Sequence, residues 1–244
     1  MTSKLYLDIL PQPDNSTCGP TCLHAIYRYF GDEIPLHQVV SEIPQIETGG
    51  TLAVYLAVHA LRRGYSAAIY SYNLQIFDPT WADAKSEDIA EKLRLQSSYK
   101  KDDPGLKIST QGYLEFLELG GELRFEVLSA GLIRRYLKRS LPVLSGLSST
   151  YLYNCAREYS EGNDLHFDDT RGKSMGHFVV LAGYDKQDRT VLVADPFLPN
   201  PVASGQYYRV NILRLVCAIM LGTLTFDGDL LILKPAVKRK RRVI

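Results

Sequence analysis

Cys18 and Gln12 carry the most reactive chemistry suggested by this chain. Cys18 lies in the run QPDNSTCGPTC and precedes apolar residues at helical spacing, so we expect a helix that begins at Cys18. The free N–H groups and the dipole at a helix start stabilise a thiolate. Gln12, six residues upstream, carries an amide that can donate a hydrogen bond to an oxyanion. A nucleophile beside such a donor predicts attack on a carbonyl carbon, and therefore an enzyme.

His177 is the candidate base for this thiol among the five histidines. It precedes an apolar run at 178–181 that predicts a strand, and a second apolar run at 191–194 ends at Asp195. If the two strands pair as a hairpin, His177 and Asp195 meet at one end of the sheet, where the carboxylate orients the imidazole. Taken singly, a histidine at a strand start and an Asp-Pro at a strand end are ordinary features. Their combination with Cys18 predicts a site.

The elements that must position these residues follow from apolar periodicity and from turn residues. Helices are predicted over 18–30, 35–42, 51–63, 86–99, 109–119, 132–139 and 210–221. Strands are predicted over 6–10, 65–72, 122–128, 141–146, 178–184, 190–194, 206–209 and 230–234. The order indicates a single α+β domain over 1–234, with a mainly helical lobe (1–139) packed against a mainly antiparallel sheet (140–234).

The four residues also carry a family resemblance. The pattern Gln-x5-Cys-Gly-Pro, then Gly-His before a strand, then Ala-Asp-Pro after the next, resembles papain-like cysteine peptidases. Within them it is most similar to the bacteriocin-processing peptidases that cut after double-glycine leaders, and to their stand-alone relatives. The resemblance implies Gln12 as oxyanion donor, Cys18 as nucleophile, His177 as base and Asp195 as its orienting carboxylate. The six-residue offset from Gln12 selects Cys18 rather than Cys22.

The resemblance covers the N-terminal third and 140–234, and it implies hydrolysis of a peptide or isopeptide bond in a peptide or protein substrate. A transpeptidase or acyltransferase would use the same four residues, and a non-catalytic binding module would keep the fold without the chemistry. The polar segment 148–175 lacks strong periodicity, which indicates a long loop. It is longer than a minimal member needs and is placed to form a lid or a substrate wall. Bacteriocin-processing members are commonly the N-terminal domain of a transporter, whereas we expect no membrane insertion here.

The composition is typical of an ordinary soluble globular protein. Apolar residues make up 45% and charged residues 23%, and the net charge of +1 gives no general attraction to nucleic acid or membrane. Six bases between 234 and 242 leave −5 on the rest, and we expect 235–244 to form a basic tail rather than a nucleic-acid site. No signal peptide is visible, and the apolar window 210–226 is too short and too polar to span a bilayer.

Cysteine usage and acidic residues complete the expectations. The four cysteines, at 18, 22, 155 and 217, have no zinc-type spacing, so we expect a reduced, cytoplasmic setting. The group at 164, 166, 168 and 169 contains three aspartates and a histidine. A solvated acidic loop explains it better than a metal site, because no spacing fixes a coordination geometry. We therefore expect neither a metal nor a cofactor.

Overall fold

The central strands are apolar throughout because both faces of the sheet are covered. The computed structural model describes residues 2–46, 49–161, 164–226 and 228–235. In the last strand, Leu231 and Leu233 belong to one buried cluster, whereas Leu230 and Ile232 belong to a second. Successive strand residues point to opposite faces, so a run such as Leu-Leu-Ile-Leu requires helices on both sides.

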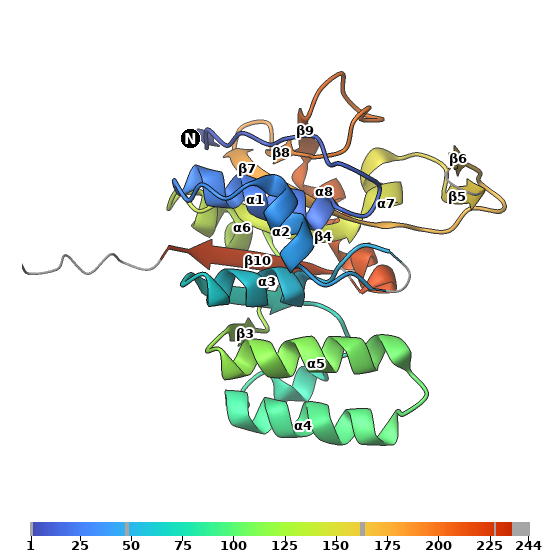
Figure 1. Cartoon of the computed structure of the whole chain (residues 1–244). Coiled ribbons are helices and arrows are strands. Elements are labelled where there is room, and N and C mark those ends of the chain that lie inside the picture. The colour runs from blue at the N-terminus through green and yellow to red at the C-terminus, as the bar shows by residue number, and fades with distance from the viewer. Residues whose placement is uncertain (1, 47–48, 162–163, 227, 236–244) are drawn as a thin grey trace, which may run out of the picture.

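The main sheet is mixed and has the order β3-β2-β10-β4-β7-β8-β9, with β1 also pairing with β7 (Figure 1). Its strands are β1 (Thr2–Lys4), β2 (Ser66–Ser71), β3 (Glu122–Arg124), β4 (Val143–Ser148), β7 (Gly176–Asp185), β8 (Thr190–Ala194), β9 (Tyr207–Asn211) and β10 (Asp229–Lys234). All pairs are antiparallel except β2–β3. The expected α+β class is confirmed, but the sheet also takes three strands from the part of the chain expected to be mainly helical.

Helices cover both faces of the sheet. The first cluster joins the sheet to α1 (Cys18–Tyr29), α3 (Ala53–Arg62) and α5 (Pro104–Glu118), and the second joins it to α6 (Ala130–Leu137), α7 (Ser149–Tyr153) and α8 (Ile212–Gly222). The remaining helices are α2 (Leu36–Glu42), α4 (Ser86–Tyr99) and the short 3₁₀ turns η1 (Pro79–Trp81) and η2 (Thr223–Thr225). A helical lobe on one face of the sheet, as expected from the sequence, is therefore only half of the arrangement.

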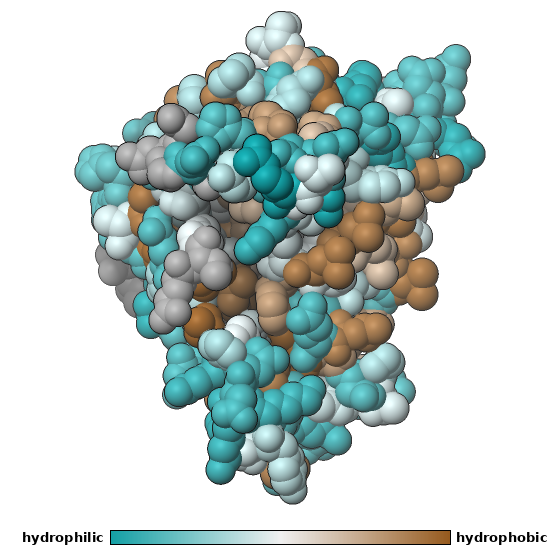
Figure 2. Space-filling view, turned by 90° about the vertical axis from the view of Figure 1, so that its right-hand side faces the viewer, coloured by the Kyte–Doolittle hydropathy of each residue, from teal (hydrophilic) through white to brown (hydrophobic). Residues whose placement is uncertain are grey.

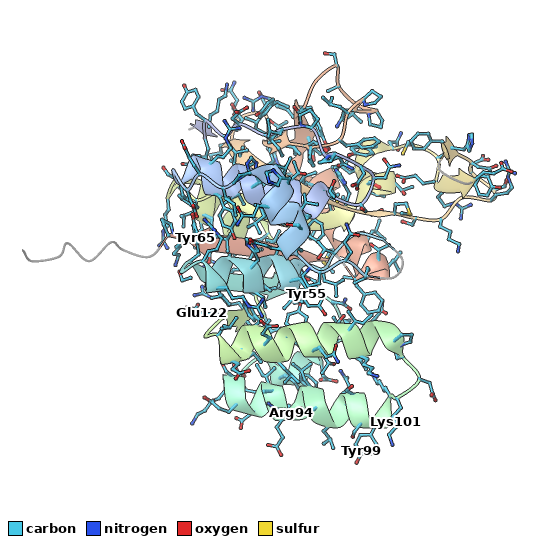
Figure 3. The ribbon with its side chains drawn as sticks, viewed as in Figure 1. Tyr55, Tyr65, Arg94, Tyr99, Lys101 and Glu122 are labelled. Carbon is cyan, nitrogen blue, oxygen red and sulfur yellow. The ribbon has the colours of Figure 1, made fainter. Side chains whose placement is uncertain are left out.

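The α4–α5 pair lies farthest from the sheet, beyond α3 (Figure 3). Tyr55 lies between α3 and α5, and its hydroxyl donates to the Ile108 carbonyl at 3.0 Å. Arg94, Tyr99 and Lys101 project from the outer side of this pair. The pair thus buries one side against α3 and exposes the other to solvent.

Four predicted segments differ from the structure. Residues 6–10 form no strand, although Leu7 and Ile9 are buried between exposed neighbours. Instead the Tyr207 hydroxyl accepts from Ile9 N at 3.0 Å and donates to Leu7 O at 2.9 Å, replacing a strand partner. The helix expected from 109 begins at Pro104, because proline suits a first helical turn and the Asp103 side chain accepts from Leu106 N.

The other two differences are a strand that is shorter than expected and a loop that contains secondary structure. The strand expected over 122–128 ends at Arg124, where pairing with β2 stops. The polar segment expected as a loop contains α7 and a separate two-stranded sheet of β5 (Glu158–Glu161) and β6 (Asp164–Phe167). This β5–β6 hairpin projects from the body beside α7.

Figure 2 shows the side from which that hairpin projects, where polar side chains lie beside one apolar area. Across the described residues, the helices are too short or too polar to cross a bilayer. Residues 236–244 of the expected basic tail lie outside the described part of the chain.

Candidate active site

The loop before α1 fixes the position of Cys18 as the first residue of that helix. The Asp14 carboxylate accepts from Ser16 N at 2.8 Å and from Ser16 Oγ at 2.7 Å, while Thr17 Oγ1 donates to Asp14 O at 3.2 Å. Burial works against the Asp14 carboxylate, but these hydrogen bonds lower its pKa. The loop therefore organises itself with its own side chains and places Cys18 at the helix N-terminus.

Gly19 lets the first turn of α1 pack closely on the strand that carries His177. A Cβ atom on Gly19 would lie 2.9 Å from Thr51 Cγ2 and 3.1 Å from Phe178 Cδ2. The first distance is shorter than real Cβ contacts and the second is tighter than most of them, so a larger residue would require Thr51, Phe178 or the helix start to shift. The glycine after Cys18 thus allows Cys18 to approach the strand that carries His177 closely.

His177 and Asp195 are brought together by the β7–β8 pairing. Val180 pairs with Ala194, so the residue after β8 lies near the start of β7. His177 Nε2 is 2.8 Å from Asp195 Oδ1, in a hydrogen-bonded ion pair. His177 is 7% exposed and Asp195 is fully buried. The hairpin predicted from the sequence therefore places the two side chains as expected.

Four donors converge on the Asp195 carboxylate. Oδ1 accepts from His177 Nε2 and from Phe197 N at 3.0 Å, and Oδ2 accepts from the hydroxyls of Tyr153 at 2.9 Å and Tyr208 at 2.6 Å. Neither tyrosine was predicted from the sequence. Tyr208 lies on β9, which pairs with β8, so pairing of the predicted strands 190–194 and 206–209 is the signal that could have found it. Tyr153 lies in α7, within the segment expected as a loop.

The electrostatics of this cluster favour a charged imidazole. Burial works against the His177 imidazolium, but the charges of Asp195 and Cys18, with hydrogen bonds to both side chains, raise the pKa of His177 well above its usual range. Burial likewise opposes the Asp195 carboxylate, yet the His177 charge and its hydrogen-bond donors lower its pKa. Since Nε2 is committed to Asp195, the other ring nitrogen is the one left for Cys18.

Cys22, four residues after Cys18 on the same helix, lies deeper in the core. It is fully buried, and its thiol donates to the Phe178 carbonyl at 3.2 Å. Burial, together with the charges of Cys18 and Asp195, raises the pKa of Cys22 well above its usual range. Cys22 is therefore held as a neutral thiol.

Gln12 is tied to the strand end that carries Asp195. Its backbone N–H donates to the Pro196 carbonyl at 2.9 Å, and its side-chain Nε2 donates to Asp14 O at 2.7 Å. An amide nitrogen carries two hydrogens, so one of them stays available to a ligand. Gln12 and His177 both line a pocket of about 50 Å³. The structure thus brings all four predicted residues to one end of the sheet.

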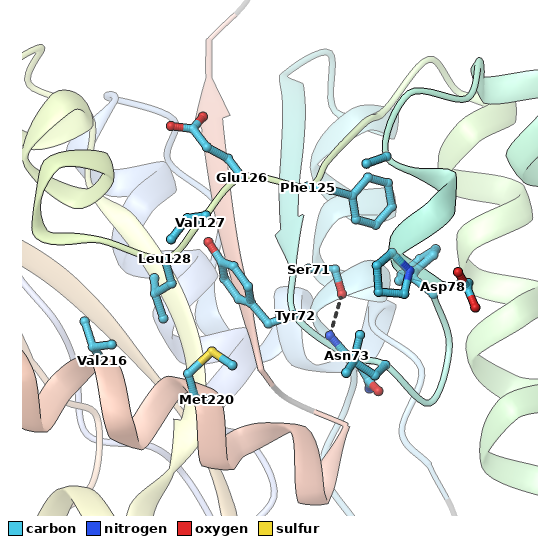
Figure 4. Close-up of a pocket in the computed structure, with 14 residues that line it drawn as sticks. Ser71, Tyr72, Asn73, Asp78, Phe125, Glu126, Val127, Leu128, Val216 and Met220 are labelled. Carbon is cyan, nitrogen blue, oxygen red and sulfur yellow. Dashed lines mark hydrogen bonds between the residues drawn. The ribbon is translucent and has the colours of Figure 1, made fainter.

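A larger cavity of about 430 Å³ contains none of these four residues. It lies between α8 and the linker that follows β3. The side chain of Tyr72 lies between Ser71 and Val127 (Figure 4). Its lining is mostly apolar and includes Met220 from α8. The reactive groups and this cavity are therefore separate features of the molecule.

Other titratable groups noted in the sequence have structural roles. His59 is held between the Tyr27 hydroxyl at 2.8 Å and Glu42 at 2.9 Å. Asp168 accepts hydrogen bonds from Thr170 and Arg171, which lower its pKa and close a turn. Within the part of the chain that the structure describes, no three His, Cys, Asp or Glu side chains gather as a metal site would require.

Comparison with known families bears on this geometry. Residues 123–214 match the Peptidase_C39 like family. His177 and Asp195 lie within the matched region of the Peptidase_C39 like family, whereas Gln12 and Cys18 precede it. The resemblance stated from the sequence is confirmed over this part of the chain, and the match agrees with the expected class of cysteine-type peptidase. A comparison with curated proteins found no match.

Several solved structures are similar to this chain in backbone arrangement, although their sequence identity to it is low. A candidate C39-like peptidase from Bacillus anthracis is 12% identical over 98% of this chain and 100% of its own, with a TM-score of 0.49. A double glycine motif protease from an AMS/PCAT transporter, in complex with its leader peptide, is 15% identical over 96% and 94%, with a TM-score of 0.45. Xylellain, a cysteine protease from Xylella fastidiosa, is 15% identical over 97% and 86%, with a TM-score of 0.44.

Proposed function

We propose that this chain is a cysteine peptidase that hydrolyses a peptide or isopeptide bond through an acyl-enzyme on Cys18. The observation that carries the proposal is the interaction of His177 with both Cys18 and the buried Asp195. A charged imidazole beside a thiol at a helix start is the arrangement that generates a thiolate at neutral pH. A binding module would need neither this pair nor four donors on one buried carboxylate.

The reaction follows from the positions of these groups. The Cys18 thiol gives its proton to His177, and the thiolate attacks the carbonyl carbon. The oxyanion accepts hydrogen bonds from the second N–H of Gln12 Nε2 and from the Cys18 backbone N–H. The His177 imidazolium then gives its proton to the leaving amine as the C–N bond breaks. Water, deprotonated by His177, attacks the thioester and releases the acid and the Cys18 thiol.

The proposal is tested with an equimolar mixture of synthetic peptides of varied sequence, whose cleavage products are identified by mass spectrometry. We expect wild-type protein to cut a subset of peptides and Cys18→Ala to cut none. Gln12→Ala should retain the same cleavage sites at a rate about 100-fold lower, because it removes one oxyanion donor. Products that gain one water identify hydrolysis, whereas products joined to an added amine identify acyl transfer.

Cys22→Ser is the matched control, since it changes a cysteine four residues away on the same helix and keeps a hydrogen-bond donor for Phe178 O. It should cut the same peptides as wild type. If wild type and Cys18→Ala gave identical products, or if Cys22→Ser abolished cleavage while the protein stayed folded, the assignment of Cys18 would be wrong.

A further inference from the structure

The small pocket beside His177 contains a carboxyl group that the proposed reaction does not use. Glu158, the first residue of β5, lines the pocket with Gln12, Ser149, Met175, His177 and Phe197. Its backbone is fixed by two hydrogen bonds, from Glu158 N to Lys173 O at 3.1 Å and from Lys173 N to Glu158 O at 2.8 Å. The backbone that carries this carboxyl is therefore held in place beside the pocket.

The Glu158 carboxyl is partly removed from water, and few hydrogen-bond donors or cations compensate for the water that it has lost. It is half-buried, and it accepts a hydrogen bond from Ser149 Oγ at 3.4 Å. Burial raises the pKa of Glu158, and the charge of His177 opposes that effect only in part. Among the described residues, no lysine or arginine forms an ion pair with it; Lys173 meets it through the backbone. A cation entering the pocket would relieve the cost of this burial.

The pocket lies on the side of the reactive pair that faces the leaving group. His177 lines it, and Cys18 does not. The imidazole protonates the leaving amine, so the substrate residue after the scissile bond must lie against the His177 side. A volume of about 50 Å³ corresponds to about three or four water-sized groups, which suits the head of a flexible side chain but not an aromatic ring.

We propose that Glu158 binds the positively charged side chain of a lysine or arginine in the residue that follows the scissile bond. This inference rests on the proposed peptidase function and gives its site a substrate preference. Ser149 Oγ and the Gln12 amide lie in the same pocket, while Met175 and Phe197 provide apolar walls for the aliphatic stem of such a side chain.

The test starts from the best-cleaved peptide of the mixture described above. That peptide is resynthesised with lysine, acetyl-lysine, leucine or glutamate directly after the cut, and kcat/KM is measured for each. We expect wild type to prefer lysine over acetyl-lysine and glutamate by about 10- to 100-fold, the range of a charge-assisted hydrogen bond. Glu158→Gln should reduce this preference to within a few-fold while still cleaving the leucine peptide, and Glu158→Lys should invert it toward glutamate.

Glu161→Gln is the matched control, because Glu161 lies on the same strand outside the pocket and is exposed. It should keep the wild-type preference. Equal rates for lysine and acetyl-lysine in wild type, an unchanged preference in Glu158→Gln, or a preference for a cation before the scissile bond would each overturn the assignment. Failure of the peptidase function itself is distinct, because then wild type would cut no peptide or Cys18→Ala would cut the same ones.

Discussion

Asp195→Asn separates the charge of the orienting residue from its hydrogen bonds. Asparagine can keep its Oδ1 toward His177 Nε2 and Phe197 N, the two donors that meet Oδ1 in the wild type at 2.8 and 3.0 Å. The amide nitrogen then faces the hydroxyls of Tyr153 and Tyr208, which can turn to accept hydrogen bonds. The substitution therefore removes a buried negative charge with little change in shape.

The expected consequence is a weaker thiolate–imidazolium pair. The charge of Asp195 is a principal cause of the raised pKa of His177, so this pKa falls in the variant. A hydrogen bond to a charged group contributes about 1.5–3 kcal/mol and a neutral one about 0.5–1.5 kcal/mol, so losing the charge while keeping the bond costs about 1–1.5 kcal/mol, which corresponds to about a 5- to 12-fold smaller population of the ion pair. Because thiolate is the form that reacts, alkylation of Cys18 should slow by about that factor at pH 6 and approach wild type at pH 9.

The assay follows alkylation of individual cysteines by iodoacetamide against pH, with mass spectrometry of the digested protein. Cys217 is exposed and serves as an internal reference in the same sample. Asp188→Asn, in the turn between β7 and β8, removes an exposed carboxylate from the same hairpin and should leave the profile unchanged. If Asp195→Asn stayed folded and alkylated Cys18 with the wild-type pH profile, the charge of Asp195 would have no part in activating the thiol.

Three further changes test other parts of the argument. Gly19→Ala should lower stability by about 1–3 kcal/mol in urea unfolding and slow Cys18 alkylation at neutral pH, since its Cβ would meet Thr51 and Phe178; unchanged values would show that the helix start has room. Tyr208→Phe removes one donor to the Asp195 carboxylate and should cost about 1–3 kcal/mol of stability, with a smaller loss of activity than Asp195→Asn; an equal loss would place Tyr208 in the reaction itself. Burial raises the pKa of Asp229 to about 7, so the folded state binds a proton more tightly than the unfolded state does. The free energy of unfolding should therefore decrease as the pH rises from about 4 to about 7. Asp229→Asn should remove this pH dependence, which amounts to up to about 4 kcal/mol. If the free energy of unfolding, measured in urea, fell by the same amount from about pH 5 to about pH 8 in the variant as in wild type, this account of Asp229 would be wrong.

The placement of the candidate residues was predictable because their signals are local and mutually consistent. A cysteine at a helix start depends on the apolar period and the Gly-Pro that follow it, and both are visible in the sequence. The meeting of His177 and Asp195 was predictable because two adjacent apolar strands joined by a short turn form a hairpin, which brings the start of one near the end of the other. The α4 helix was predicted with its observed bounds from its acidic first turn and polar end.

Partners that are distant in the chain were decided by the tertiary structure alone. Tyr153 and Tyr208 reach Asp195 from elements 42 and 13 residues away, and nothing in their local sequence distinguishes them from the other tyrosines. Residues 6–10 alternate as a strand does, but an alternating pattern reports only which side chains are buried. Whether the backbone finds a strand or the hydroxyl of Tyr207 as its partner depends on what packs against it. The sequence by itself therefore determined the candidate reactive groups and their order along the chain. Tertiary packing determined the donors around the buried Asp195 carboxylate and the position of the Glu158 carboxyl beside the imidazole, because burial and charge arise from neighbours that only the fold brings together.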